Sequence, residues 1–272
     1  MRKIRLLLEY DGTGYHGWQI QRHGPTIQGI LEERIMHITG EVSGVRGASR
    51  TDAGVHALGQ VAVFSTASDL SPEKIKQALN ALLPPDIRVL EASAAHDMFR
   101  PRNDALRKRY FYVIANQNSS SAFLFRYAWL IRQPLDLKSM KAAGDVLPGV
   151  HDFSSFMGTG SGIKNPVREI YSLEIRRIKK MSFMTGEVNG NFIRITIEAN
   201  GFLRHMVRNI VGTLAEIGRG KMPYGRMGEI LLSRDRKCAG PTAPGNGLFL
   251  ERITYESLFA CSGRSLTLHN FT

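Results

Sequence analysis

Asp52 is the side chain best placed to do chemistry, because of the residues around it in the segment Gly47–His56. Arg50 stands two positions earlier and therefore shares one side of an extended chain with it. A neighbouring guanidinium favours the ionised carboxylate, the form that acts as a nucleophile or a base. Gly47 and Gly54 bracket the pair and let the backbone come close to a ligand. The competing interpretation is structural, since Asp-Ala-Gly is also an ordinary turn sequence.

A second group of useful side chains lies in Met98–Tyr112, where basic residues run directly into aromatic ones. Cations hold phosphates and aromatic rings stack on bases, so this mixture suits a single-stranded or flipped nucleotide. A solvated basic loop followed by an ordinary strand would have the same composition. Both interpretations stay open at this point.

Two arginines, Arg204 and Arg208, are four residues apart in Gly201–Gly218, a stretch with the periodicity of an amphipathic helix. On such a helix they would stack one turn apart and form a phosphate-binding ridge, while Phe202 and Met206 would share another face. A surface stripe on a core helix would show the same spacing.

Gly12–Gly17 matches the Gly-x-Gly-x-x-Gly pattern of dinucleotide-binding sites and follows a predicted strand. That pattern needs a helix to begin at the glycines, so that the helix N-terminus meets the pyrophosphate. The residues from Trp18 to Pro25 do not continue as a helix. The glycines therefore predict a turn, and a nucleotide-dependent oxidoreductase is the least favoured function.

Strands and helices alternate in both halves of the chain, which predicts a mixed α/β fold (α+β) without a mobile linker. In the N-terminal half the pattern predicts strands at 3–10, 60–64 and 87–90, and helices at 27–39, after the N-cap Thr26, and at 72–83. In the C-terminal half it predicts strands at 109–114, 171–178 and 192–198, and helices at 136–147, 201–218 and 224–232.

These elements indicate two packed subdomains, each an antiparallel or mixed sheet with helices on one face. With a boundary near residues 100–106, the subdomains are 1–104, which carries Asp52, and 105–255, followed by a tail at 256–272. The 36 Lys and Arg outweigh the 24 Asp and Glu and give a net charge of +12. We therefore expect a basic central cleft and a polyanionic partner, although a diffusely solvated basic surface has the same composition.

The chain of 272 residues is 43% hydrophobic, enough to bury a core without metal or disulfide support. Its two cysteines, Cys238 and Cys261, lie far apart and outside any zinc-binding spacing, so neither a metal nor a disulfide is expected. No stretch approaches the roughly 18 apolar residues of a membrane span, and Glu9 and Asp11 interrupt the N-terminal apolar run. We expect a cytoplasmic protein with no membrane partner.

Taken together, segments spread over the chain strongly resemble the bacterial TruA family of tRNA pseudouridine synthases, from about Ile4 to about Ile253. Each segment alone is weak evidence for the family, but the order and spacing of the segments together are specific to it. The matching segments are Glu9–Gly12, Gly17–Gln19, Arg50–His56, Lys108–Tyr112, Asp152–Phe156, Pro166–Arg168, Met206–Ile210 and Gly247–Leu250.

By this resemblance, Asp52 aligns with the catalytic aspartate and Tyr110 with the tyrosine that contacts the target base. Arg50 aligns with the arginine that holds the aspartate and helps expel the stacked base, and Arg208 is the basic residue that faces the aspartate. The further cations expected to bind substrate are Lys108, Arg168 and Arg204. The resemblance also implies a pair of related α/β subdomains joined through one continuous sheet, and a homodimer.

The implied reaction isomerises uridine to pseudouridine at positions 38, 39 and 40 of the tRNA anticodon arm. It breaks the bond from ribose to N1 and makes one to C5 without redox change, so no cofactor is expected. Asp52 could attack C6, attack the anomeric carbon or remove a sugar proton, and the sequence does not choose among these. The alternative function is a non-catalytic RNA-binding protein, which needs the basic and aromatic segments but not the pairing of Arg50 with Asp52.

Overall fold

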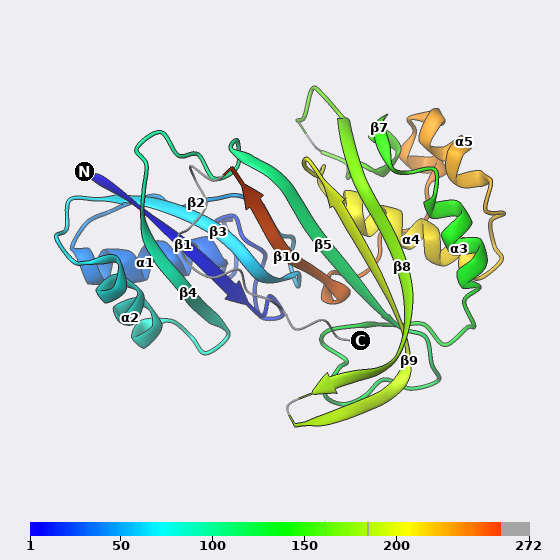
Figure 1. Cartoon of the computed structure of the whole chain (residues 1–272), viewed down its shortest axis with the longest axis horizontal. Helices are drawn as coiled ribbons and strands as arrows, with labels where there is room; N and C mark the ends of the chain where they lie inside the picture. Colours follow the sequence, from blue (N-terminus) through cyan, green and yellow to red (C-terminus); the bar gives the residue numbers. More distant parts are fainter. Residues whose placement is uncertain (161, 184, 257–272) are drawn as a thin grey trace.

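One mixed sheet runs through the molecule. The computed structural model describes residues 1–160, 162–183 and 185–256. Within this part the sheet has ten strands, in the order β4-β1-β3-β10-β5-β9-β8-β7, with β2 beside β3 and β6 beside β5 (Figure 1). The predicted mixed α/β class is confirmed, and the continuous sheet implied by the family resemblance is present.

The N-terminal half forms one end of the sheet and carries two helices. Its elements are β1 (Arg2–Tyr10), α1 (Ile27–Thr39), β2 (Arg46–Gly47), β3 (His56–Thr66), α2 (Pro72–Leu82) and β4 (Ile87–Ala95). Alternate residues of β1, Ile4, Leu6 and Leu8, are fully buried in one cluster with apolar residues of both helices. Thr26 is the N-cap of α1, as predicted, and accepts a hydrogen bond from the amide of Gly29.

The C-terminal half forms the other end. Its elements are β5 (Ala105–Ala115), β6 (Trp129–Leu130), α3 (Leu137–Gly144), β7 (Gly149–Asp152), η1 (Ser154–Phe156), β8 (Val167–Phe183), β9 (Gly186–Ala199), α4 (Met206–Gly218), α5 (Arg226–Ser233), η2 (Arg236–Cys238), η3 (Gly245–Gly247) and β10 (Leu248–Tyr255). The α4 helix is buried along nearly its whole length.

The strand β10 joins the two halves, although it is the last of the described strands along the chain. It pairs in parallel with β3 over two residues, Phe249 with His56 and Leu250 with Ala57. On its other side it pairs antiparallel with β5. The sheet is therefore continuous across the molecule because β10, which follows the other described strands in the sequence, lies between β3 and β5.

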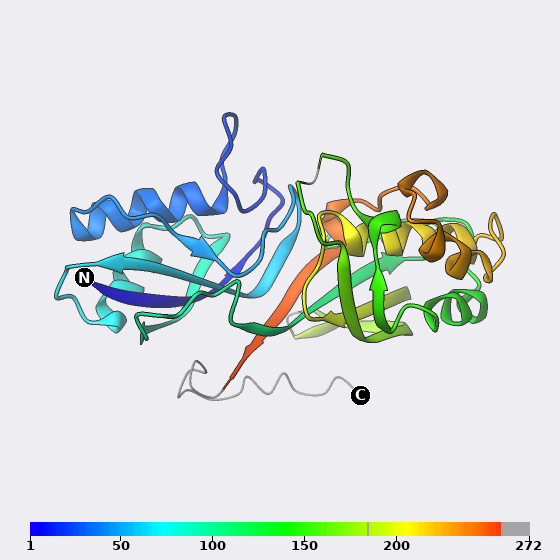
Figure 2. The same ribbon diagram turned by 90° about the horizontal axis from the view of Figure 1, so that it is seen from above.

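The two faces of the sheet differ in character. The helices α1 and α4 lie on the same side, as the view in Figure 2 shows. Tyr110 and Tyr112 of β5 point into the apolar core on this side. The intervening residues of β5 belong to the other face, where an ion-pair network is formed by Arg107, Arg109, Arg194, Glu198, Glu251 and Arg252.

The predicted helix at 201–218 is wrong at its start, because α4 begins at Met206. His205 has a left-handed backbone (φ 60°), which no helix continues through. Phe202 packs edge-on against Tyr110, and the carbonyl of Arg204 accepts a hydrogen bond from the amide of Gly158. These tertiary contacts hold the five residues before α4 in an irregular connection that ends in a turn, so Arg204 and Arg208 do not form a ridge.

Other boundaries differ less. The helices predicted at 136–147 and 224–232 are α3 and α5, which are shorter or shifted by about two residues. The predicted division at 104/105 falls immediately before β5, in the connection that follows β4, and stays a prediction. The tail at 256–272 lies outside the described residues beyond Glu256. Among the described helices, none is long and apolar enough to cross a membrane.

Candidate active site

Asp52 lies between the two halves, on the loop that connects β2 to β3. Its Oδ2 accepts a hydrogen bond of 2.9 Å from Nη1 of Arg208, at the start of α4. The two residues are 156 positions apart in the sequence. About a quarter of the Asp52 side chain is exposed, so the carboxylate is held by protein and still open to a ligand. An ionised carboxylate in such a place can act as a nucleophile or a base.

Arg208 is itself fixed by the loop before β10. Its Nε donates to the carbonyl of Ala243 at 2.7 Å, and the amide of Ala243 donates to the carbonyl of Arg208 at 3.1 Å. The next residue, Asn209, is fully buried and accepts hydrogen bonds from Arg236 and Thr242. A guanidinium with one edge occupied in this way presents its other edge to Asp52 in one orientation.

Gln60 of β3 clamps the loop that carries Asp52. Its side chain is fully buried, and it donates to the carbonyl of Ser49 at 2.7 Å while accepting from the amide of Ser49 at 3.2 Å. Two tyrosines hold neighbouring hydroxyls, with Tyr110 bonded to Ser49 and Tyr10 bonded to Thr51, each at 2.8 Å. The backbone on the N-terminal side of Asp52 is therefore tied to three strands.

Tyr110 of β5 lies close enough to Asp52 for the charge of the carboxylate to act on its hydroxyl. Burial raises the pKa of its hydroxyl above the usual range, and the negative charge of Asp52 adds to this effect, so the phenol is neutral. Phe202 covers it edge-on, with 5.2 Å between ring centroids. Only 5% of Tyr110 is exposed, so in this conformation it offers a base little stacking surface.

Three cations lie close to one another near Tyr110. They are Lys108, two residues before Tyr110 on β5, and Arg102 and Arg168. Lys108 is 7% exposed, and its Nζ donates to the carbonyl of Ala48 at 2.7 Å. Burial lowers the pKa of Lys108 to about 8, and the charges of Arg102 and Arg168 lower it further. Within the described part of the chain, none of the three is paired with a carboxylate. Their mutual repulsion would be relieved by an anion such as a phosphate.

Two arginines differ from the picture that the sequence suggests. Arg50 is exposed and forms no ion pair with Asp52 among the described residues; the aspartate is held by Arg208 instead. Arg204 donates to the carbonyl of Thr159 at 3.2 Å, on the loop opposite the site. Among the described residues, neither guanidinium group is thus paired with the carboxylate of Asp52.

His205 is the site residue that the sequence did not reveal. Its Nε2 lies 3.6 Å from Oδ1 of Asp52, the carboxylate oxygen that Arg208 does not occupy. No sequence pattern marks this position, since the periodicity of 201–218 includes His205 in the helix. The only hint is its place directly before the matching segment Met206–Ile210.

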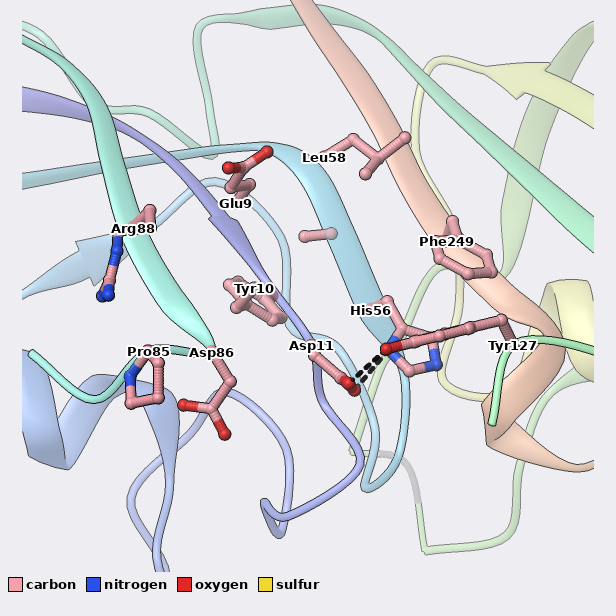
Figure 3. Close-up of a pocket in the computed structure, with 11 residues that line it drawn as sticks. Glu9, Tyr10, Asp11, His56, Leu58, Pro85, Asp86, Arg88, Tyr127 and Phe249 are labelled. Atoms are coloured by element: carbon pink, nitrogen blue, oxygen red, sulfur yellow. Dashed lines mark hydrogen bonds and ion pairs between the residues drawn. The ribbon is translucent and has the colours of Figure 1, made fainter. Parts of the chain in front are cut away.

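His56, in contrast, has a structural role. It is 1% exposed; Nδ1 accepts from the amide of Gly12, and Nε2 lies near the carbonyls of Arg126 and Asn246. Burial lowers the pKa of His56, which keeps the ring neutral, so its 3.0 Å contact with Asp11 is not a charged pair. The same ring borders a cavity of about 240 Å³ that does not include Asp52 (Figure 3).

Gly12–Gly17 is a turn, as predicted, because the next helix begins only at Ile27. Close approach explains one of its glycines: a Cβ at Gly17, where φ is 89°, would lie 2.6 Å from the carbonyl oxygen of Thr51. The segment thus supports the loop of Asp52. It forms no helix N-terminus to receive a pyrophosphate.

Comparison with known proteins agrees with this geometry. A family model described as tRNA pseudouridine synthase matches residues 7–102 and 143–256, which is more than half of the chain. The chain belongs to the tRNA pseudouridine synthase family. As a pseudouridine synthase it is an enzyme, an isomerase of uridine in tRNA, and the activity predicted from the sequence is confirmed.

Curated relatives of this pseudouridine synthase carry the name tRNA pseudouridine synthase A. The protein from Thermoanaerobacter sp. (strain X514) is 46% identical over 94% of this chain and 100% of its own length. The protein from Thermodesulfovibrio yellowstonii is 43% identical with the same coverage, and that from Myxococcus xanthus is 41% identical over 94% of this chain and 92% of its own. A solved archaeal box H/ACA sRNP Nop10-Cbf5 complex has 11% identity and a TM-score of 0.31, covering 78% of this chain and 44% of its own, too little similarity to bear on function.

Proposed function

We propose that this pseudouridine synthase modifies uridines 38, 39 and 40 of the tRNA anticodon arm, with Asp52 as the nucleophile or base. The observation that carries the assignment is the pairing of Asp52 with Arg208 across the two halves of the molecule. It leaves the Asp52 carboxylate about a quarter exposed, with Oδ1 not held by Arg208, at the place where a loop, a helix and β5 converge. A non-catalytic RNA-binding protein would not need such a carboxylate.

A paired uridine must leave its stack before it can reach Asp52. Unstacking costs a few kcal/mol, which contacts to the flipped nucleotide offset. Arg50 is exposed on the same loop, and we assign it to the space that the base leaves. Asp52 then begins the transfer of the ribose bond from N1 to C5, by attack on the base or the sugar or by removal of a sugar proton.

The RNA backbone would be held by the cations around the site. Lys108 and Arg168, together with Arg102, form an unneutralised group beside Tyr110, and Arg204 lies across the site on the rim. We also propose a cytoplasmic homodimer whose protomers divide into subdomains 1–104 and 105–255; the resemblance to the TruA family supports this organisation. Sedimentation at several protein concentrations tests the dimer.

Replacement of the carboxylate tests the assignment. Asp52→Asn and Asp52→Ala should abolish release of tritium from tRNA that carries 5-tritiated uridine, because among the described residues no other carboxylate pairs with Arg208 or His205. tRNA binding should change little, since Asp52 contributes no positive charge. The matched control is Asp69→Asn, at an exposed aspartate in the connection between β3 and α2, which should retain full activity. Substantial tritium release by either Asp52 variant would remove Asp52 from the reaction.

A further inference from the structure

His205 approaches the one carboxylate oxygen of Asp52 that the protein leaves open. Nε2 lies 3.6 Å from Oδ1, while Oδ2 is occupied by Arg208. About a quarter of the His205 side chain is exposed, as for Asp52. A uridine in contact with Oδ1 would therefore meet the imidazole directly or through one water molecule, the range in which proton transfer takes place.

The backbone around His205 is arranged to aim this ring. His205 is one of only two non-glycine residues with positive φ among those that the structure describes. Strained conformations of this kind persist where the surroundings enforce them, and they concentrate at functional sites. The ring packs against Gly158, where a Cβ would lie 2.8 Å from Nδ1, and the amide of Gly158 donates to the carbonyl of Arg204 at 2.8 Å.

The environment keeps the imidazole uncharged. Burial lowers the pKa of His205, and the positive charges of Arg208, Arg204 and Arg236 lower it further, against the opposing effect of Asp52. These four groups are the charged residues that act on the ring. At neutral pH the ring therefore has a free nitrogen lone pair and can accept a proton, which the neutral, buried phenol of Tyr110 does poorly.

The chemistry of the reaction requires such an acceptor. When the C1′–N1 bond breaks and the C1′–C5 bond forms, C5 carries a hydrogen that must leave as a proton, and N1 must gain one. Asp52 cannot accept the C5 proton while it is bonded to the substrate or already protonated. Of the groups that contact Asp52, Arg208 is a cation and cannot accept a proton.

We propose that His205 accepts the proton released from C5 of the uridine and so restores the aromatic ring of pseudouridine. The proton moves from C5 to an imidazole nitrogen, and the electron pair of the C–H bond returns to the ring of the base. The imidazolium then gives the proton to N1 of the product, or gives it to solvent while N1 takes a proton from solvent, so atoms and charge balance. This inference rests on the proposed function of Asp52.

The test replaces His205 by glycine, which adopts positive φ without strain and leaves a space for a small molecule. His205→Gly should lower the single-turnover rate about 100-fold, the effect typical of a lost general base. Added imidazole should restore part of the rate. With 5-deuterated uridine in the tRNA, the variant should show a larger isotope effect than the unmodified enzyme, because C5 deprotonation has become slow.

The matched control is Arg234→Gly, at the other non-glycine residue with positive φ, which lies away from Asp52 at the end of α5. It should leave rate and isotope effect unchanged. An unaltered rate in His205→Gly would overturn the proposal, as would a slow variant with no response to imidazole and an unchanged isotope effect. Failure of the proposed function is distinguishable, because the unmodified protein would then release no tritium.

Discussion

At the scale of single residues, the site separates two tasks that one arginine could have performed. Arg208 holds the carboxylate of Asp52 at 2.9 Å, and its other edge is bound to the carbonyl of Ala243. Arg50 is exposed and has no such bond to Asp52. Arg208 of α4 therefore orients the carboxylate of Asp52, and the side chain of Arg50 is left to contact the RNA.

This division predicts different defects in the two variants. Arg208→Ala should lower the single-turnover rate by roughly 10² to 10³, as for loss of one preorganised charge contact, with little change in tRNA affinity.

Arg50→Ala should slow the reaction more for a paired uridine of the stem than for an unstacked uridine in an oligonucleotide, because only the former needs a replacement in the stack. Rapid-quench kinetics on both substrates measures this, and equal defects on both would remove Arg50 from base expulsion.

A second prediction at this scale concerns pH. The pKa of Lys108 is about 8 in the free protein, and a bound phosphate would raise it. Binding then takes up a proton above pH 8, so tRNA affinity should fall by up to about tenfold per pH unit there and stay constant below pH 7. Fluorescence anisotropy at constant ionic strength measures the affinity.

Replacement of the lysine provides the control for that pH dependence. Lys108→Met should bind less tightly at neutral pH and lose the dependence above pH 8. Lys74→Met, at an exposed position of α2, should behave like the unmodified protein. If the pH profile of Lys108→Met matches that of the unmodified enzyme, Lys108 does not contact the RNA backbone.

At the scale of elements, β3 does more than complete the sheet. Gln60 on this strand is fully buried, and its side-chain amide forms hydrogen bonds with the backbone of Ser49, three residues before Asp52. A buried polar side chain that bonds almost only to the loop of Asp52, the proposed catalytic residue, would act as a positioning residue. The glycine turn at Gly17 supports the same loop from the other side, through its close approach to Thr51.

Gln60→Leu should therefore slow catalysis and leave substrate binding nearly unchanged. The buried amide and carbonyl of Ser49 lose their partner, which should lower the free energy of unfolding by about 1–3 kcal/mol. Urea denaturation gives the stability, and tritium release at several tRNA concentrations separates kcat from KM. Gln77→Leu, at an exposed position of α2, is the control. A defect in KM alone would argue against a role for Gln60 in holding Asp52.

At the scale of the whole molecule, β10 joins the two halves into one continuous sheet. It pairs with β3 on one side and β5 on the other, so Asp52 and α4 keep a fixed relation across the sheet. The helix-bearing side holds the site, and the other side of the sheet carries arginines that are paired with Glu198 and Glu251. Among the described residues, Lys108, Arg102 and Arg168 have no such carboxylate partner, and we expect them to contact an RNA backbone.

The net charge of +12 leads to a prediction at this scale. If about 6 to 10 phosphates are neutralised, tRNA affinity should fall by roughly 10³ to 10⁵ between about 50 and 200 mM salt, because condensed counterions are released on binding. Filter binding over a salt series measures the slope. Asp52→Asn should show the same slope as the unmodified enzyme. A flat response would mean that the positive charge lies away from the bound RNA.

The sequence by itself determined the α/β class, the first two helices with the N-cap Thr26 of the first, and the family through the order of its matching segments. Thr26 and Ser71 act within a few residues of themselves, so local chemistry is enough to predict α1 and α2. Asp52 could likewise be singled out before the fold was known, because Arg50–His56 is one of the ordered segments that identify the family.

Only the tertiary structure decided how the side chains of the site are held. The family resemblance implied that Arg208 faces Asp52, but the hydrogen bond between them spans 156 positions, and no local pattern contains it. Periodicity placed residues 201–205 in a helix, but the packing of Phe202 on Tyr110 and the hydrogen bond to Arg204 outweigh local helix propensity. The left-handed backbone of His205 follows from those contacts, and through it the imidazole reaches Asp52.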